Sequence, residues 1–126
     1  MLLVRDQHDS AFRLPGGLVG RPGEAVHDAL RRTLAEHLNA GIVRLDFFAA
    51  VEHHTQNDPN GRPVHEVALL FDLTLTEPVP AASSGCELRW ATDAALREID
   101  LRPAAIADRL RSSALTANDV WWSAVT

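Results

Sequence analysis

Near the N-terminus, a glycine-rich turn leads directly into the longest helical pattern of the chain. The turn begins with Leu14-Pro15-Gly16-Gly17 and ends with Pro22-Gly23-Glu24. Adjacent glycines let the backbone take shapes closed to other residues and approach a ligand closely. After the turn, apolar residues recur every four positions, which predicts an amphipathic helix over residues 24–38 with one buried stripe. The stripe consists of Val26, Leu30, Leu34 and Leu38.

Strand-like and helix-like segments are mixed along the rest of the chain. The expected strands lie at residues 2–4, 12–14, 42–51, 67–75 and 88–91. Thr92 is expected to cap a brief helix through Ile99, and Pro103 to open a last helix that ends near Leu110. Strong turn signals separate strands at 56–63 and 78–85. The pattern predicts a mixed β-sheet with helices packed on its faces.

Composition and charge narrow the class of protein. The length of 126 residues fits one compact domain, so residues 1–126 are interpreted as a single domain. Seventeen acidic and twelve basic residues give a net charge of −5, which argues against nucleic acid or an anionic membrane as partner. No apolar run approaches the ~20 residues of a membrane span, and no secretory leader is recognised, so a cytoplasmic location is expected. The single cysteine, Cys86, excludes an internal disulfide and a cysteine zinc cluster.

Charged side chains gather on one face of the expected helix. Glu24, Asp28, Arg32 and Glu36 follow each other at steps of four residues. Acidic groups on such a face can hold Mg²⁺, and Mg²⁺ in turn binds phosphate oxygens. From the charges alone, a solvated stripe of i,i+4 ion pairs on an ordinary surface helix is the simpler interpretation.

The order of these residues resembles the Nudix box. The pattern of that box is Gly, five residues, Glu, seven residues, and then Arg-Glu-aliphatic-x-Glu-Glu-x-Gly-aliphatic. Its matching positions in this chain are Gly17, Glu24, Arg32, Leu34 and Glu36. The similarity runs from about residue 2 to residue 111, with the box region at 16–40 and a C-terminal tail at 112–126. It implies a Nudix fold, in which a mixed β-sheet is sandwiched between helices (α/β/α).

The box in this chain is degenerate. Thr33 replaces the glutamate that follows the arginine, His37 replaces the second member of the Glu-Glu pair, and Asn39 replaces the glycine. Six residues instead of five separate Gly17 from Glu24. Because Mg²⁺ prefers oxygen ligands and imidazole better suits ions such as Mn²⁺ or Zn²⁺, we expect His37 to weaken a magnesium site or to change its metal. The alternative is that His37 packs beside the sheet with one ring nitrogen hydrogen-bonded.

The resemblance implies roles for the residues that remain. Glu36 is the principal remaining metal ligand and catalytic carboxylate, supported by the backbone carbonyl of Gly16 and, as an alternative ligand, by His37. Arg32 is expected to pair with Glu36 at i+4 and to orient it. The implied cofactor is Mg²⁺ or Mn²⁺. Glu24 is a motif residue that, at the least, favours the positive end of the helix dipole.

Further carboxylates and histidines follow in the strands after the box. Family members often place an additional catalytic or metal-binding glutamate there, and Glu52 and Glu66 are the two candidates, although Glu66 also fits a hairpin surface position. His53 and His54 are adjacent, so on a strand they point to opposite faces, which is a poor spacing for joint metal ligation. His65 is interpreted as a polar residue at a strand end.

Two functions are compatible with this sequence. The first is a Nudix-like hydrolase that cleaves the pyrophosphate bond of a nucleoside diphosphate derivative with the help of a divalent metal. The intact Gly16-Gly17, Glu24, Arg32 and Glu36 favour it. The second is a catalytically inactive Nudix module that binds a nucleotide, another phosphorylated metabolite or a protein partner. The replacements at Thr33 and His37 favour this second interpretation.

The C-terminal tail is a candidate for an additional strand of the sheet. Nudix domains usually carry a strand before the one that matches residues 2–4, and this chain starts too late to include it. An uncovered sheet edge invites pairing. Residues 120–125 have strand composition, and we expect them to cover the edge within the same chain or by exchange into a homodimer. The alternative is a loose tail in which Trp121 and Trp122 dock on the core.

Overall fold

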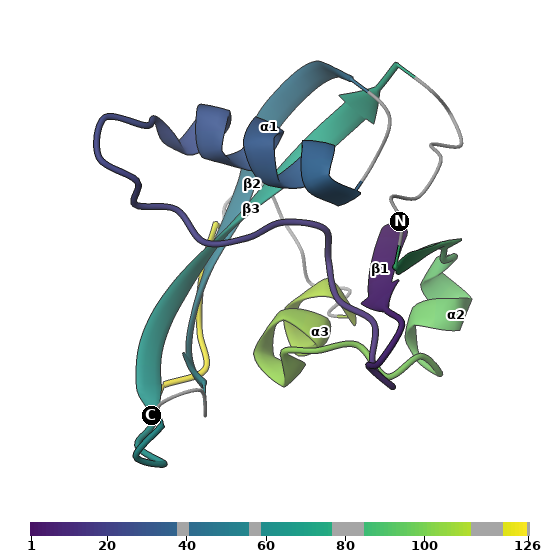
Figure 1. The fold of residues 1–126 in the computed structure, drawn as a ribbon. Coiled ribbons are helices and arrows are strands. Elements are labelled where there is room, and N and C mark those ends of the chain that lie inside the picture. The colour runs from purple at the N-terminus through teal and green to yellow at the C-terminus, as the bar shows by residue number, and fades with distance from the viewer. Residues whose placement is uncertain (38–40, 56–58, 77–84, 112–119, 126) are drawn as a thin grey trace. The chain divides into compact units, whose positions relative to one another are not determined.

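The structure of the chain is a computed structural model (Figure 1). It describes residues 1–37, 41–55, 59–76, 85–111 and 120–125, without the side chain of His37. The expectations for Leu38, Asn39, residues 56–58 and residues 78–84 therefore lie outside the described residues. The elements are β1 (Leu2–Asp6), α1 (Val26–His37), β2 (Ile42–Thr55), β3 (Val64–Leu75), β4 (Cys86–Trp90), α2 (Asp93–Leu96), α3 (Ala104–Arg111) and β5 (Trp121–Ser123).

The described strands form two sheets. β1 pairs antiparallel with β4, and Leu3 lies opposite Arg89 in their register. In the second sheet the strand order is β3-β2-β5, and β5 runs parallel to β2 with Trp122 opposite Val51. Antiparallel and parallel pairing both occur, and helices accompany the strands. The mixed α/β class expected from the sequence is thus confirmed.

The chain divides into two compact units. The first contains Met1–Leu45 and Leu73–Leu101, and the second contains Asp46–Asp72 and Arg102–Thr126. β2 and β3 each contribute residues to both units because the divisions fall within these two strands. The sequence interpretation of residues 1–126 as a single domain stays a prediction.

The first unit holds its own apolar core around the β1–β4 sheet residues and the helices α1 and α2. The short extended piece expected near residue 12 joins this unit by backbone bonds. The Arg13 N–H donates to the Val4 carbonyl at 2.9 Å, and the Phe12 N–H donates to the Asp100 carbonyl at 2.8 Å. Its buried apolar residues are Leu3, Val4, Phe12, Ala29, Leu34, Ala91, Leu96, Ile99 and Leu101.

The helix boundaries follow local sequence signals closely. α1 begins at Val26, two residues after the expected start, and buries Ala29 and Leu34. Thr92 caps α2 as expected, because its Oγ1 accepts a hydrogen bond from the Ala95 N–H at 3.2 Å. α3 begins at Ala104, directly after the proline that was expected to open it.

The second unit is built from the larger part of the β3-β2-β5 sheet and α3. Arg109 of α3 is only 2% exposed, and its guanidinium carbon lies 5.9 Å from the Phe48 ring centre and 5.6 Å from that of Trp122. These cation–π contacts connect the helix with β2 and β5. The other buried residues of this unit are Ala49, Ala50, Val51, His53, Leu70, Ile106 and Ala107.

The tail contains the expected strand, in the same chain, but it does not cover the edge for which it was expected: among the described strands β1 pairs with β4 alone, whereas β5 pairs with β2 in the other sheet. β5 covers one edge of β2, where the Ala50 N–H donates to the Val120 carbonyl at 2.7 Å. On the other side of the short strand, the Ala124 N–H donates to the Glu52 carbonyl at 2.9 Å. The tail is therefore hydrogen-bonded into a sheet and is more than a pair of docked tryptophans. Its exchange between two copies stays a prediction.

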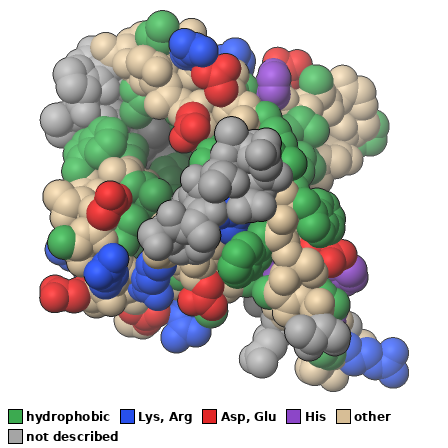
Figure 2. All heavy atoms as spheres, turned by 180° about the vertical axis from the view of Figure 1, so that it is seen from behind, with side chains coloured by type: hydrophobic (Ala, Val, Ile, Leu, Met, Phe, Trp, Pro, Cys, Tyr) green, Lys and Arg blue, Asp and Glu red, His purple; other side chains and the backbone are tan. Residues whose placement is uncertain are grey.

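Several large apolar side chains remain at the surface. The space-filling view shows hydrophobic side chains between charged ones on the face that it draws (Figure 2). Leu18, in the turn before α1, is the most exposed of the described large apolar residues at 82%. None of the described helices is long and apolar enough to cross a membrane.

Candidate functional site

The turn and helix singled out by the sequence are held together by a bidentate ion pair. Arg32 of α1 donates from Nε to Glu24 Oε2 at 3.0 Å and from Nη2 to Glu24 Oε1 at 3.1 Å. A guanidinium and a carboxylate match each other in this two-point geometry. The hydrogen bonds from Arg32 hold the pKa of the Glu24 carboxyl below its usual value. Glu24 therefore fixes the arginine, a role beyond the dipole effect expected from the sequence.

Glu36 stands in a different relation to the same arginine. Its Oε1 lies 3.7 Å from Arg32 Nη1, one helical turn along α1, and its side chain is 61% exposed. The pairing expected at i+4 is present, but it is longer than the contact between Arg32 and Glu24. The main partner of Arg32 is therefore Glu24, and the Glu36 carboxylate stays open to solvent.

The residue that replaces a box glutamate takes part in packing. Thr33 is 5% exposed, and its hydroxyl donates to the carbonyl of Leu30 at 3.1 Å. A Cβ added to Gly17 would lie 2.8 Å from Thr33 Cγ2, so only glycine fits in the turn at this contact. The Thr33 side chain thus supports the turn, and its hydroxyl is bound within its own helix.

The remaining metal-ligand candidates of the box are described only in part. Gly16 has a φ of 155°, which favours glycine, and a Cβ there would meet nothing within 4 Å. The helix includes His37, but the side chain of this residue lies outside the described part of the structure. The ligand roles of Gly16, Glu36 and His37 stay predictions.

The two glutamates expected to supplement the box both lie in the second unit. Glu52 of β2 accepts a 2.7 Å hydrogen bond from the hydroxyl of Ser123, and its Oε2 lies 2.8 Å from His65 Nε2. The bond from Ser123, with the one to His65, holds the pKa of the Glu52 carboxyl below its usual value. Glu66 of β3 lies with its Oε1 3.1 Å from His53 Nε2. Each glutamate is therefore joined to a histidine of the neighbouring strand.

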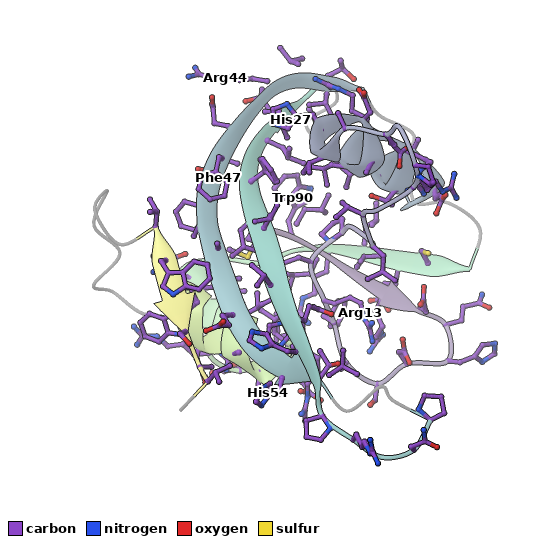
Figure 3. All side chains as sticks on the ribbon, turned by 90° about the vertical axis from the view of Figure 1, so that its left-hand side faces the viewer. Arg13, His27, Arg44, Phe47, His54 and Trp90 are labelled. Atoms are coloured by element: carbon purple, nitrogen blue, oxygen red, sulfur yellow. The ribbon has the colours of Figure 1, made fainter. Side chains whose placement is uncertain are left out.

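The two adjacent histidines of β2 point to opposite faces, as expected from the strand period. His53 is 2% exposed, whereas His54 is exposed near the end of β2 (Figure 3). The His54 ring meets the His65 ring edge-on, with 5.5 Å between their centres. Within the described residues, no group of three His, Cys, Asp or Glu side chains could hold a metal ion.

Sequence reasoning did not predict the contacts that Glu24, Glu52 and Glu66 make, and two of them show why. The fork between Arg32 and Glu24 joins residues eight positions apart, so the i+4 rule does not reveal it. The bond between Ser123 and Glu52 joins residues 71 positions apart, and only the parallel pairing of β5 with β2 brings them together. The strand composition of the tail was the one signal in the sequence that pointed toward the second contact.

Comparisons with known proteins place this geometry in a fold family. No protein-family model matches the sequence, and no curated protein matches it significantly. Among solved structures, a MutT protein from Methanosarcina mazei Go1 is similar with a TM-score of 0.66 and 23% identity, over 86% of this chain and 78% of that one. A mutator MutT protein from Bacillus halodurans is similar with a TM-score of 0.63 and 16% identity, over 96% and 76%.

The chain has a Nudix fold. The solution structure of the E. coli ORF135 protein is also similar, with a TM-score of 0.54 and 27% identity over 86% of this chain and 75% of that one. These similarities support the relationship to the Nudix family that Gly17, Glu24, Arg32 and Glu36 indicated. At these identities they concern the fold, and the chemistry has to be argued from the residues.

Proposed function

We propose that this protein is a Nudix-type hydrolase that cleaves the pyrophosphate bond of a nucleoside diphosphate derivative in a reaction that depends on a divalent metal. In this reaction water attacks a phosphorus atom, and the bond between that phosphorus and the bridging oxygen breaks. The similarity to MutT proteins supports the reaction class. The panel of substrates described below identifies the group attached to the diphosphate.

One observation carries the proposal. The Glu24–Arg32 fork anchors the glycine turn to α1 and leaves the Glu36 carboxylate 61% exposed one turn away. The fork joins Glu24, two residues before α1, to the second turn of the helix, and so fixes the arginine beside Glu36. A carboxylate held beside a fixed arginine and open to solvent is available to a metal ion or to an attacking water.

The described donor set does not by itself fit a Mg²⁺ cluster. Thr33 turns its hydroxyl to the Leu30 carbonyl, and Glu36 is the carboxylate of the box that remains open on α1. Mg²⁺ in proteins is bound by one or two carboxylates together with waters and substrate phosphates. One carboxylate is the lower limit of that range, so the substrate's own oxygens would have to complete the site. We therefore assign no catalytic step through the metal.

A specific observation favours a second function, a module that binds a phosphorylated ligand without cleaving it. Thr33 is buried against Gly17, so the replacement of the family glutamate is built into the packing of the turn. A turn stabilised in this way can keep a ligand pocket while the chemistry is lost. The partners under this alternative are a nucleotide, another phosphometabolite or a protein.

Product release from a panel of nucleoside diphosphate derivatives, with Mg²⁺ and Mn²⁺ in parallel, separates the two functions. We expect turnover by the native chain and a loss of at least about 100-fold in Glu36→Gln, the order of effect typical of a positioned catalytic group. Glu98→Gln, which changes an exposed glutamate two residues after α2, is the matched control and should leave turnover unchanged.

The double variant Thr33→Glu/His37→Glu gives the decisive contrast. If the native chain is silent and this variant is active, the scaffold binds substrate but has lost its own chemistry, and the hydrolase proposal is wrong. If Glu36→Gln is as active as the native chain, the assignment of Glu36 is wrong. If neither the native chain nor the double variant releases product but the native chain binds a member of the panel, the protein is a binding module and the hydrolase proposal is wrong.

A further inference from the structure

The turn before α1 carries a second arginine, Arg21, which has no part in the reaction proposed above. Pro22 and Gly23 follow it, and Gly23 has a φ of 77°. The Glu24 N–H donates to the Arg21 carbonyl at 3.1 Å, which closes a β-turn of the kind that favours proline and then glycine at its two central positions. The first and last Cα atoms of such a turn lie less than about 7 Å apart. Arg21 is therefore held close to Glu24, just before the start of α1 (Figure 1).

Arg21 and Arg32 act on the same carboxylate within the first compact unit. The pKa of Glu24 is lowered chiefly by the hydrogen bonds from Arg32, and in addition by the positive charges of Arg32 and Arg21. The Arg21 side chain is exposed, and no ion pair joins it to a carboxylate in the part of the chain that the structure describes. Its guanidinium is thus positioned by the turn and open to an anion from solvent.

Arg32 also retains donors for a ligand. A guanidinium has five N–H groups, and the fork to Glu24 uses one on Nε and one on Nη2. Nη1 lies 3.7 Å from Glu36 Oε1, which is too long for a hydrogen bond. The Arg32 side chain is 25% exposed. Among the described residues, the N–H groups on Nη1 are therefore left for a bound molecule or for water.

The replacements in the box shift its charge in the same direction. Thr33 and His37 stand where the box pattern has glutamates, so two of the negative charges of that pattern are missing here. The two arginines then balance the two carboxylates that remain on the turn and on α1. A cluster of carboxylates repels a phosphate until a metal ion neutralises the charge. A site that presents guanidinium groups attracts it, because their planar fork matches phosphate oxygens.

We propose that Arg21 and Arg32 bind the diphosphate group of the substrate directly, without a divalent metal. This inference rests on the proposed function, from which it takes the diphosphate as the group to be bound. The two guanidiniums donate charge-assisted hydrogen bonds to the phosphate oxygens. Arg21 thereby supplies part of the positive charge that the incomplete set of metal ligands cannot gather. The metal of the proposed reaction is then required for turnover and not for holding the substrate.

Titration of the isotope-labelled full chain with inorganic pyrophosphate and with ADP, in the presence of EDTA, tests the site. Amide NMR spectra report both the affinity and the place of binding. We expect dissociation constants of about 1 mM or tighter for both molecules. The largest shifts should fall on residues 16–25 and on α1, and added salt should weaken binding. Adenosine, which lacks the diphosphate, should cause no such shifts.

Three variants separate a specific site from general attraction. Arg21→Gln should weaken the binding of pyrophosphate and ADP about fivefold, the upper end of what an exposed charge pair contributes. Arg21→Lys keeps the charge and loses the fork, so its affinity should lie between those of the native chain and Arg21→Gln. Arg97→Gln removes the same charge from an exposed arginine directly after α2 in the same compact unit, and should bind as the native chain does.

The proposal is overturned if neither pyrophosphate nor ADP binds up to about 10 mM in EDTA. It is equally overturned if Arg21→Gln binds as tightly as the native chain, or if Arg97→Gln weakens binding as much. All three variants change exposed side chains, and amide spectra that are unchanged away from the substitution show that they fold. Turnover of the substrate panel together with a failure here would leave a hydrolase that holds its substrate through metal. Binding in EDTA together with a silent panel would leave the arginine site in a binding module.

Discussion

At the scale of single residues, the position of one arginine governs the candidate site. Arg32 gives its two-point contact to Glu24 and only a longer contact to Glu36. Both carboxylates lie within reach of the same guanidinium, but the 19% exposed Glu24 is the more shielded of the two. Shielding strengthens the ion pair with Glu24. The site therefore contains one carboxylate held by the arginine and one open to solvent.

The Glu24–Arg32 pair should make stability depend on pH. The bonds from Arg32 lower the pKa of Glu24 in the folded chain relative to the unfolded chain. Its contribution is therefore fully present above the usual carboxyl pKa of about 4.5, and it is lost as the pH falls through the lower folded value. We expect Glu24→Gln to be less stable than the native chain at neutral pH, and the difference to shrink below about pH 4.

Urea unfolding at a series of pH values, without divalent metal, measures this difference. Glu98→Gln, which removes an exposed carboxylate outside the pair, controls for general charge effects. A stability difference between Glu24→Gln and the native chain that stays constant from pH 7 to pH 3 would contradict the assignment.

At the scale of elements, the turn and α1 are joined by a tight steric contact. Gly17 approaches Thr33 so closely that a methyl group would lie 2.8 Å from Thr33 Cγ2. We expect Gly17→Ala to lower the free energy of unfolding by about 1–3 kcal/mol, the usual effect of overpacking. Adding Thr33→Ser, which keeps the hydroxyl and removes the methyl group, should restore part of that stability.

Thermal and urea unfolding measure this prediction. Gly41→Ala is the control, because a Cβ there would meet Thr76 Cγ2 at 3.4 Å, close to ordinary contact. Gly17→Ala with native stability would show that the turn moves away from the helix freely. A double variant no more stable than Gly17→Ala would show that Thr33 is not the obstacle.

At the same scale, some local sequence signals are sufficient to predict where a helix or strand begins or ends, and others are not. Thr92 and Pro103 mark helix starts through local chemistry, and the structure places helices at both. β2 was expected to end at Val51 but continues to Thr55. Its last residues are polar, and Glu52 and His53 are stabilised by partners on β3 that lie 13 positions further along the chain. Such pairing between strands is invisible to a local pattern.

At the scale of the whole molecule, the candidate site could be predicted only for residues that lie close together in the sequence. Gly17, Glu24, Arg32 and Glu36 lie within one turn and one helix, so their order in the sequence was enough to select them as candidates through the resemblance to the Nudix box. The partners of Glu52 could not be found in this way. Ser123 reaches it only because the tail forms β5 beside β2. Contacts made by distant segments depend on the fold, and no spacing rule encodes them.

The tail is therefore the part of the chain whose removal should have the widest effect. Deleting residues 117–126 removes β5, including the two backbone hydrogen bonds at its ends to Ala50 and Glu52, and the Trp122 ring beside Arg109. At roughly 1 kcal/mol for each hydrogen bond and about 1 kcal/mol for the cation–π contact, the chain should lose about 3 kcal/mol of stability. The backbone of β2 at Ala50 and Glu52 would also become an open edge, which promotes aggregation.

Urea unfolding and light scattering on a sizing column measure stability and mass for the deletion and for Trp121→Ala. That control keeps β5 and removes a side chain that is 55% exposed, so it should change stability little. If the deleted chain keeps native stability, solubility and mass, β5 does not hold the sheet. If the native chain is a dimer and the deletion is a stable monomer, the tail is exchanged between two copies. If the native chain and the deleted chain are both monomers and the deletion is less stable, β5 stabilises its own chain. The hydrogen bonds that hold β5 are then intramolecular.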